Sequence, residues 1–144
     1  MAQAAFEAAE AEGAARLLRA EEARVEDMLA AGGYLFCGPE NLGALSGAMK
    51  EFFDRAYYPL LEQVEGRAYA QMICAGSDGT AAARQLARIA TGWRLKEVQA
   101  ALIVNTAAQS AEAILAPKEL SEAALAPCRE LGAALAAGLA LGVF

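Results

Sequence analysis

The sequence of 144 residues contains no histidine. This absence excludes Ser-His-Asp and Cys-His catalysis, in which an imidazole is the base, and every metal site with a histidine ligand. Basic residues are also few, with 12 Lys and Arg against 18 Asp and Glu, which gives a net charge of −6. Nucleic-acid binders usually carry a basic face, so no nucleic-acid partner is expected. Any chemistry should therefore belong to a bound cofactor.

Cysteine is scarce as well. Cys37, Cys74 and Cys128 lie far apart, and no pair has the spacing of a CxxC motif. Such a set forms neither a disulfide framework nor a zinc site. Free cysteines are commonly buried, so we expect three reduced thiols within the fold.

Long hydrophobic runs are missing. The most membrane-like stretch, residues 131–144, is shorter than the roughly 20 residues that a membrane-spanning helix needs. The N-terminus has neither the basic start nor the apolar stretch of a secretory signal. The sequence thus predicts a cytoplasmic protein with no membrane partner.

What the chain does contain is an alternation of helical and strand patterns over one domain, residues 1–144. Apolar runs predict strands, and apolar residues at helical spacing predict helices. The expected strands are 15–19 (weak), 34–37, 69–75 and 100–105. The expected helices are 2–12, 21–31, 45–56, 80–91 and a last one carrying Leu131, Leu135 and Leu139, which Pro127 either starts or kinks. This order predicts an α/β three-layer sandwich around a mostly parallel sheet.

Two glycine-bracketed loops follow expected strands, at residues 38–43 and 76–79. Ligands of open parallel sheets bind beyond the carboxyl ends of the strands, and glycine lets backbone N–H groups approach a flat ligand. The alternative is ordinary turn chemistry, with Asp78 capping the next helix. The candidate binding residues are Pro39, Glu40, Asn41, Leu42, Gly43, Gly76, Ser77, Asp78 and Gly79.

The stretch 33–93 resembles the flavodoxin-like family of FMN reductases and NAD(P)H:quinone oxidoreductases. Residues 39–55, PENLGALSGAMKEFFDR, are similar to that family's first flavin loop and the helix after it, and residues 76–79, GSDG, to its second flavin loop. The resemblance implies that residues 39–43 contact the edge of the isoalloxazine ring and that residues 76–79 contact the ring or the ribityl chain. It also implies a small-molecule electron donor, NAD(P)H, a quinone or similar acceptor, and a homo-oligomer whose second subunit helps to form the site.

One part of the family pattern is missing from the sequence. The family holds the FMN phosphate in a Ser/Thr-rich loop after a central first strand, and residue 2 already belongs to the expected helix after that loop. We therefore expect an N-terminally truncated flavodoxin-like sheet of four strands that binds FMN weakly or not at all. Alternatively, residues 15–19 pair directly with residues 34–37. The competing function is a non-catalytic flavodoxin-like remnant that acts as a binding or structural module.

Overall fold

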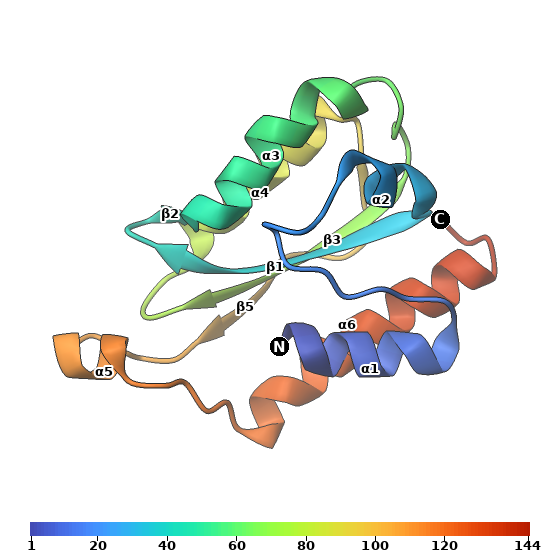
Figure 1. Ribbon diagram of the computed structural model, residues 1–144. Helices are drawn as coiled ribbons and strands as arrows, with labels where there is room; N and C mark the ends of the chain where they lie inside the picture. Colours follow the sequence, from blue (N-terminus) through green and yellow to red (C-terminus); the bar gives the residue numbers. More distant parts are fainter.

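A mostly parallel sheet forms the centre of the computed structural model, which describes residues 1–144 (Figure 1). Strand β1 (Gly33–Asn41) pairs in parallel with β3 (Ala68–Ala75), and β3 pairs in parallel with β4 (Lys96–Glu97) and β5 (Leu102–Asn105). The short strand β2 (Ala44–Leu45) is antiparallel to the end of β1. The sheet has five strands, where four were expected, because β2 and β4 are two-residue strands that form only through tertiary pairing.

Helices cover both faces of this sheet (Figure 1). On one face lie α2 (Val25–Ala30), α3 (Gly47–Leu60) and α4 (Thr80–Gly92), over a core that contains Phe36, Phe53 and Trp93. On the other face lie α1 (Ala2–Glu12) and α6 (Glu122–Ala140), over a smaller core around Met72, Cys128 and Leu131. The short helix α5 (Ala111–Leu115) precedes α6 and contributes no buried residue. The three-layer α/β architecture around a mostly parallel sheet, predicted from the sequence, is confirmed.

Helices α1 and α6 cross in close contact at Gly132. A Cβ atom added there would lie 2.1 Å from the carbonyl oxygen of Ala5, a distance that no side chain can accept. Glycine at this position lets the two backbones approach, and α1 is thereby held against the lower face of the sheet.

Helix α6 extends well beyond the leucines at 131, 135 and 139 that predicted it. It begins at Glu122, where the Ser121 hydroxyl accepts the Ala124 N–H, and runs for 19 residues with Pro127 inside it, so Pro127 does not start it. By length and composition α6 is the one helix that could cross a membrane. In this fold Leu131 and Leu135 are buried against the sheet, so packing in the core explains the apolar side of α6.

Two expectations for the N-terminal region are wrong. Residues 15–19 form no strand: residues 14–18 form no backbone hydrogen bond, the Arg19 carbonyl accepts the N–H groups of Glu22 and Ala23, and β1 pairs with β3 and β2 but not with this segment. The expected helix 21–31 is only α2, which starts at Val25. Its start is fixed by the Arg24 N–H, which donates to the Asp27 carboxylate at 2.9 Å and thereby holds the pKa of Asp27 below its usual value.

Candidate functional site

The carboxyl ends of β1 and β3 lie side by side. Pro39 pairs in register with Cys74 at the end of the parallel ladder, so the segments that follow the two strands meet at the same edge of the sheet. Figure 1 shows this edge with the β1–β2 hairpin and the β3–α4 loop next to one another. The nine candidate residues are therefore gathered in one place.

The first candidate segment is mainly strand, where a loop was expected. Pro39, Glu40 and Asn41 belong to β1, because Glu40 and Asn41 pair with Leu45 and Ala44 of β2. Only Leu42 and Gly43 form the turn, and both have positive φ, 52° and 72°. The Leu42 side chain is completely exposed at the tip of this hairpin.

Glu40 links the two segments. Its carboxylate accepts the Gly79 N–H at 2.8 Å and the Ala82 N–H at 3.3 Å. These N–H groups belong to the first turn of α4, where backbone donors have no partner within the helix and the helix dipole favours negative charge. The cap of α4 is thus supplied by Glu40 and not, as the alternative from the sequence had it, by Asp78, whose carboxylate accepts the Thr80 hydroxyl.

Packing explains the two glycines of the second segment. A Cβ atom on Gly76 would lie 2.7 Å from the Ala108 carbonyl oxygen, and one on Gly79 would lie 2.6 Å from Cγ2 of Ile103. Gly79 also has a φ of 86°, which favours glycine. The tight loop is further held by the Asn105 amide, which donates to the Ser77 carbonyl.

Five backbone N–H groups at this edge have no hydrogen-bond partner within the chain. They belong to Leu42, Gly43, Gly76, Ser77 and Asp78, and four of these residues are exposed while Gly76 is half-buried. Such groups are satisfied by water, or by the acceptor atoms of a ligand that displaces it. The two segments therefore offer a row of donors on adjoining loops.

The segment after β5 adds residues that the sequence analysis missed. Asn105 and Thr106 hold the neighbouring loop, since the Thr106 N–H donates to the Ala75 carbonyl at 2.8 Å. On their other side they line a cavity of about 370 Å³ with residues 117–121 and Ala124. The available signal was the Asn-Thr pair that ends the strand 102–105, because polar residues at a strand's carboxyl end face the same edge.

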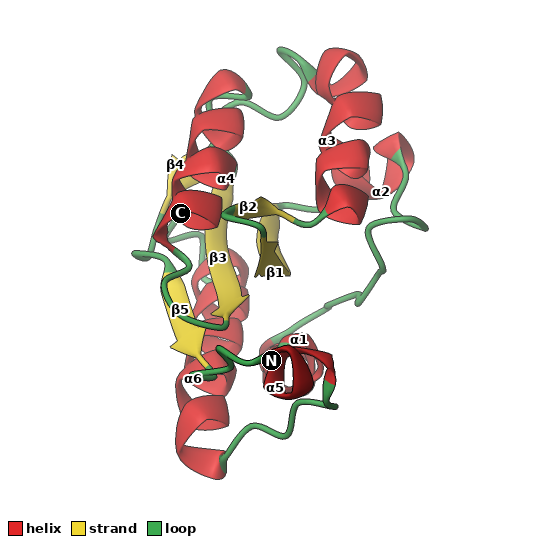
Figure 2. Ribbon diagram, turned by 90° about the vertical axis from the view of Figure 1, so that its left-hand side faces the viewer, coloured by secondary structure: helices red, strands yellow, loops and turns green.

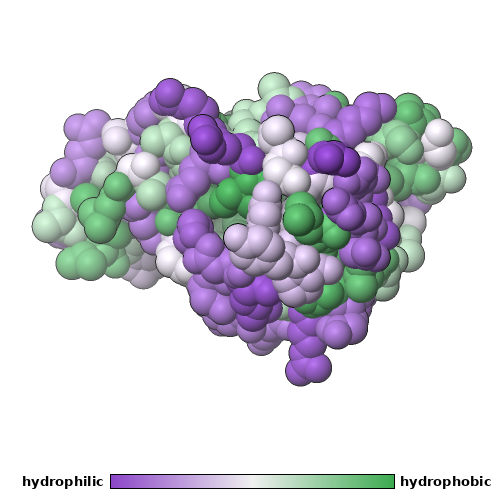
Figure 3. Space-filling model, turned by 90° about the horizontal axis from the view of Figure 1, so that it is seen from above, coloured by the Kyte–Doolittle hydropathy of each residue, from purple (hydrophilic) through white to green (hydrophobic).

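Exposed apolar side chains lie at this end of the molecule. Leu42 belongs to the hairpin, and Ile114 and Leu115, which are 58% and 84% exposed, belong to α5, which Figure 1 shows at the same end and apart from the hairpin. Figure 3 shows the molecule from above, with hydrophilic residues over much of its middle and hydrophobic residues at both ends. The end that carries the hairpin and α5 in Figure 1 is therefore partly apolar on its surface.

The three thiols are free, as the sequence predicted, but only one is fully buried. Cys128 is buried, and Cys37 and Cys74 are half-buried on β1 and β3. Burial raises the pKa of the Cys37 thiol to about 11, so it is protonated at neutral pH. A thiolate nucleophile at Cys37 is therefore not part of the site.

Comparison with known proteins agrees with the fold. The family described as NADPH-dependent FMN reductase matches residues 4–109. A flavodoxin, WrbA-like protein from Agrobacterium tumefaciens superposes with a TM-score of 0.73 at 18% identity over 96% of this chain and 87% of that one. A flavodoxin from the domain Archaea superposes with a TM-score of 0.74 at 12% identity, over 96% of this chain and 87% of that one.

A third structure, an NADPH-quinone reductase from P. pentosaceus, has a TM-score of 0.61 at 16% identity over 91% of this chain and 88% of that one. No curated protein matches the sequence significantly. At these identities the structures establish the flavodoxin-like fold, and the family match covers most of the chain. The protein belongs to the NADPH-dependent FMN reductase family.

Proposed function

We propose that this protein is a cytoplasmic, FMN-dependent oxidoreductase that passes electrons from NAD(P)H to a quinone or a similar acceptor. The five unpartnered N–H groups on the adjoining loops support the proposal most directly. The isoalloxazine ring is flat and carries carbonyl oxygens and ring nitrogens that accept hydrogen bonds. When bound, FMN takes up hydride and releases electrons, so the protein needs only to hold and orient it.

In this proposal the candidate residues surround the ring from two sides. Pro39, Glu40, Asn41, Leu42 and Gly43 would lie along its edge, and Gly76, Ser77, Asp78 and Gly79 would contact the ring or the ribityl chain. The Glu40 carboxylate would be close to the ring while capping α4. A fixed negative charge there would disfavour the anionic reduced flavin and so lower its reduction potential.

The acceptor is proposed on the exposed apolar residues of this edge. Leu42, Ile114 and Leu115 would contact a planar, weakly polar molecule such as a quinone better than a charged one. The likeness to an NADPH-quinone reductase is consistent with this choice. A homo-oligomer in which a second subunit closes the site completes the proposal.

The charges of the nine candidate residues favour weak binding of FMN. The nine candidate residues include two carboxylates, Glu40 and Asp78, and no Lys or Arg, so no cation among them faces the FMN phosphate. The same observation supports the second candidate function, a flavodoxin-like remnant that keeps the fold without turnover.

Titration of FMN with the protein tests the first proposal through quenching of flavin fluorescence. We expect saturable quenching with weak affinity, and NADPH consumption with added FMN and a quinone above a boiled control. Ser77→Trp places a large side chain among the free N–H groups and should weaken binding at least tenfold. Thr91→Trp, at another exposed position at the far end of α4, is the matched control and should bind like the original protein.

The remnant function predicts other results. Absence of saturable quenching, together with NADPH consumption no faster than in the boiled control, would favour it. Equal FMN affinity of the two tryptophan variants would place the flavin elsewhere on the molecule.

A further inference from the structure

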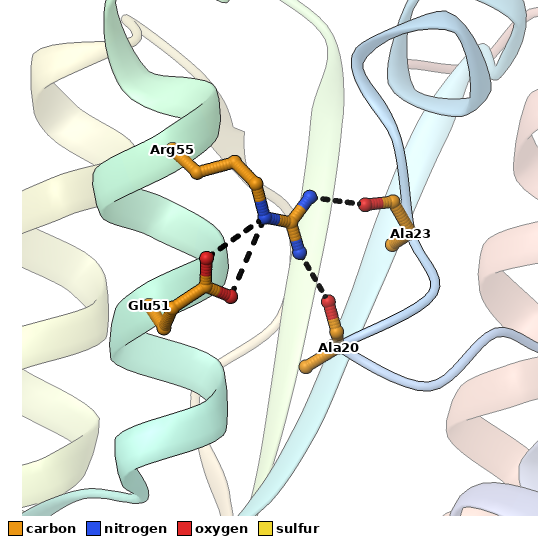
Figure 4. A network of polar contacts seen from close by, with 4 residues as sticks. All are labelled: Ala20, Ala23, Glu51 and Arg55. Carbon is orange, nitrogen blue, oxygen red and sulfur yellow. Dashed lines mark hydrogen bonds and ion pairs between the residues drawn. The ribbon is translucent and has the colours of Figure 1, made fainter.

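Most arginines of this chain have hydrogen-bond acceptors within it. Arg55 of α3 is an example (Figure 4): its guanidinium donates to the carbonyls of Ala20 at 2.8 Å and Ala23 at 2.5 Å, and its Nε donates to Glu51 at 3.0 Å. Arg67 donates in the same way to backbone carbonyls at the end of α2. Such side chains hold the fold together, and their donors are occupied.

Arg84 and Arg88 of α4 are different. Both are exposed, and neither side chain forms a hydrogen bond or an ion pair with the rest of the chain. Helix α4, with the sequence TAAARQLARIATG, contains no Asp or Glu. Residues four apart lie on the same face of a helix, where two like charges repel each other. In a protein of net charge −6 this pair is a local, uncompensated positive charge that suits an anion.

The pair lies close to the candidate site. Helix α4 begins at Thr80, directly after the loop 76–79, and Thr80, Arg84 and Arg88 share one face because they are four residues apart. At 1.5 Å per residue, Arg84 lies about 6 Å and Arg88 about 12 Å from Thr80 along the helix axis. Figures 1 and 2 both show α4 beside α3 on the same face of the sheet, in the layer that ends at this edge. The two arginines therefore lead away from the site along an exposed helix face.

Other charged groups near this edge are less suited to an anion. Lys118 donates to three backbone carbonyls around the end of α5, and Lys50 of α3 forms an ion pair with Asp54. Glu40 and Asp78 are carboxylates that repel one. An anionic ligand that reaches the free N–H groups of the loops thus finds unoccupied guanidinium donors on α4.

We propose that Arg84 and Arg88 bind the phosphate on the adenosine 2′-oxygen of NADPH and so select NADPH over NADH as the electron donor. This inference rests on the proposed function, in which NAD(P)H is the donor. The two nucleotides differ only in that phosphate, and a guanidinium binds phosphate oxygens through parallel hydrogen bonds. The nicotinamide would lie at the loops 39–43 and 76–79, and the adenosine end would lie over the exposed face of α4.

Calorimetric titration with two nucleotide fragments tests the inference. Adenosine 2′,5′-bisphosphate carries the 2′-phosphate and no nicotinamide, and adenosine 5′-monophosphate lacks only that phosphate. We expect the bisphosphate to bind at least tenfold more tightly at low ionic strength, because the guanidinium groups face the 2′-phosphate.

Matched variants locate the phosphate. Arg84→Ala combined with Arg88→Ala keeps the helix, since alanine is the best helix former, and should reduce the difference between the two fragments to less than twofold. Arg19→Ala removes an exposed arginine without a side-chain partner outside α4 and should leave the difference unchanged. With FMN and a quinone present, the double variant should also lower kcat/KM for NADPH relative to that for NADH at least tenfold, through KM.

Three results would overturn the inference: equal affinity for the two fragments, a preference that the double variant keeps, or inorganic phosphate that binds as tightly as the bisphosphate. The last would mean that α4 attracts anions in general. The titrations need no flavin, so they remain decisive if FMN does not bind and the proposed function fails. Saturable FMN binding without a preference for the bisphosphate would overturn this inference alone.

Discussion

Strands β1 and β3 are neighbours of similar length and similar apolar character, and they differ in burial. β3 has strand partners on both sides, and seven of its eight residues are buried. β1 has one partner along most of its length, and two of its nine residues are buried. Since the two sequences are comparably apolar at residues 34–37 and 69–75, the number of neighbouring strands decides how much of each strand is enclosed.

The largest expected effect comes from truncating a core side chain on β3. Ile73 is fully buried, so Ile73→Ala should lower the free energy of unfolding by about 3 kcal/mol, through lost burial and the cavity left behind. The same truncation on β1, Leu35→Ala, removes a half-buried side chain and should cost about 1 kcal/mol. Urea denaturation measures both, and equal costs would show that β1 is as enclosed as β3.

The reactivity of the Cys37 thiol measures how well the face of β1 that carries it is enclosed. A thiol with a pKa of about 11 carries about a hundredfold less thiolate at pH 8 than one at the ordinary value of 9.0, so Cys37 should react about a hundredfold more slowly with iodoacetamide in the folded protein than in urea. Its rate should rise about tenfold per pH unit up to that pKa. Mass spectrometry of peptides distinguishes Cys37 from Cys74 and Cys128. Alkylation of Cys37 at the rate found in urea would mean that water reaches the face of β1 under α1.

The helix that covers this face can be displaced. Gly132→Ala introduces a Cβ atom against the Ala5 carbonyl oxygen and should lower the free energy of unfolding by about 2 kcal/mol, since the two backbones must move apart. Gly47→Ala is the control, because no atom lies within 4 Å of the added Cβ. The Gly132 variant should also speed alkylation of Cys37. A normal unfolding midpoint for both variants would mean that α1 contributes little to the cover of β1.

The smallest effect concerns a polar side chain within β3. Gln71 is buried, its Oε1 atom has no hydrogen-bond partner, and its Nε2 atom donates to Glu97 at 3.4 Å. Gln71→Leu removes an unsatisfied acceptor and should raise the free energy of unfolding by about 1 kcal/mol. The measurement is the same urea titration, and a loss of stability would show that the Glu97 contact outweighs the unpaired oxygen.

The spacing of apolar residues was enough to predict the strands and helices whose own residues are mostly apolar or carry a clear apolar face. The strand expected at 69–75 is Ala68–Ala75, and the helix expected at 80–91 is Thr80–Gly92. An apolar run or an apolar helical face needs only a core to pack against, and a chain of this composition supplies one. The run expected to form a strand at 15–19 is short and contains two arginines, and it does not pair with the open edge of β1.

The candidate site was predictable in outline and not in detail. Parallel topology alone brings the segments after two neighbouring strands to one edge, so the meeting of residues 39–43 with 76–79 followed from the order of elements. The Glu40 cap of α4 and the Asn105 contact to Ser77 could not be predicted. Each joins residues about thirty or forty positions apart along the chain, and no local pattern encodes such a contact.

The stretch 14–18, which forms no backbone hydrogen bonds, also bears on how the polypeptide withstands proteases. Arg16 is exposed in residues 14–18, which form no backbone hydrogen bonds, and an exposed segment of this kind is one that trypsin cleaves readily. Helix α1 would remain attached after such a cut, since it is held by its crossing with α6 at Gly132. The nicked protein would thus persist as a two-piece complex whose small fragment is released only when the remainder unfolds.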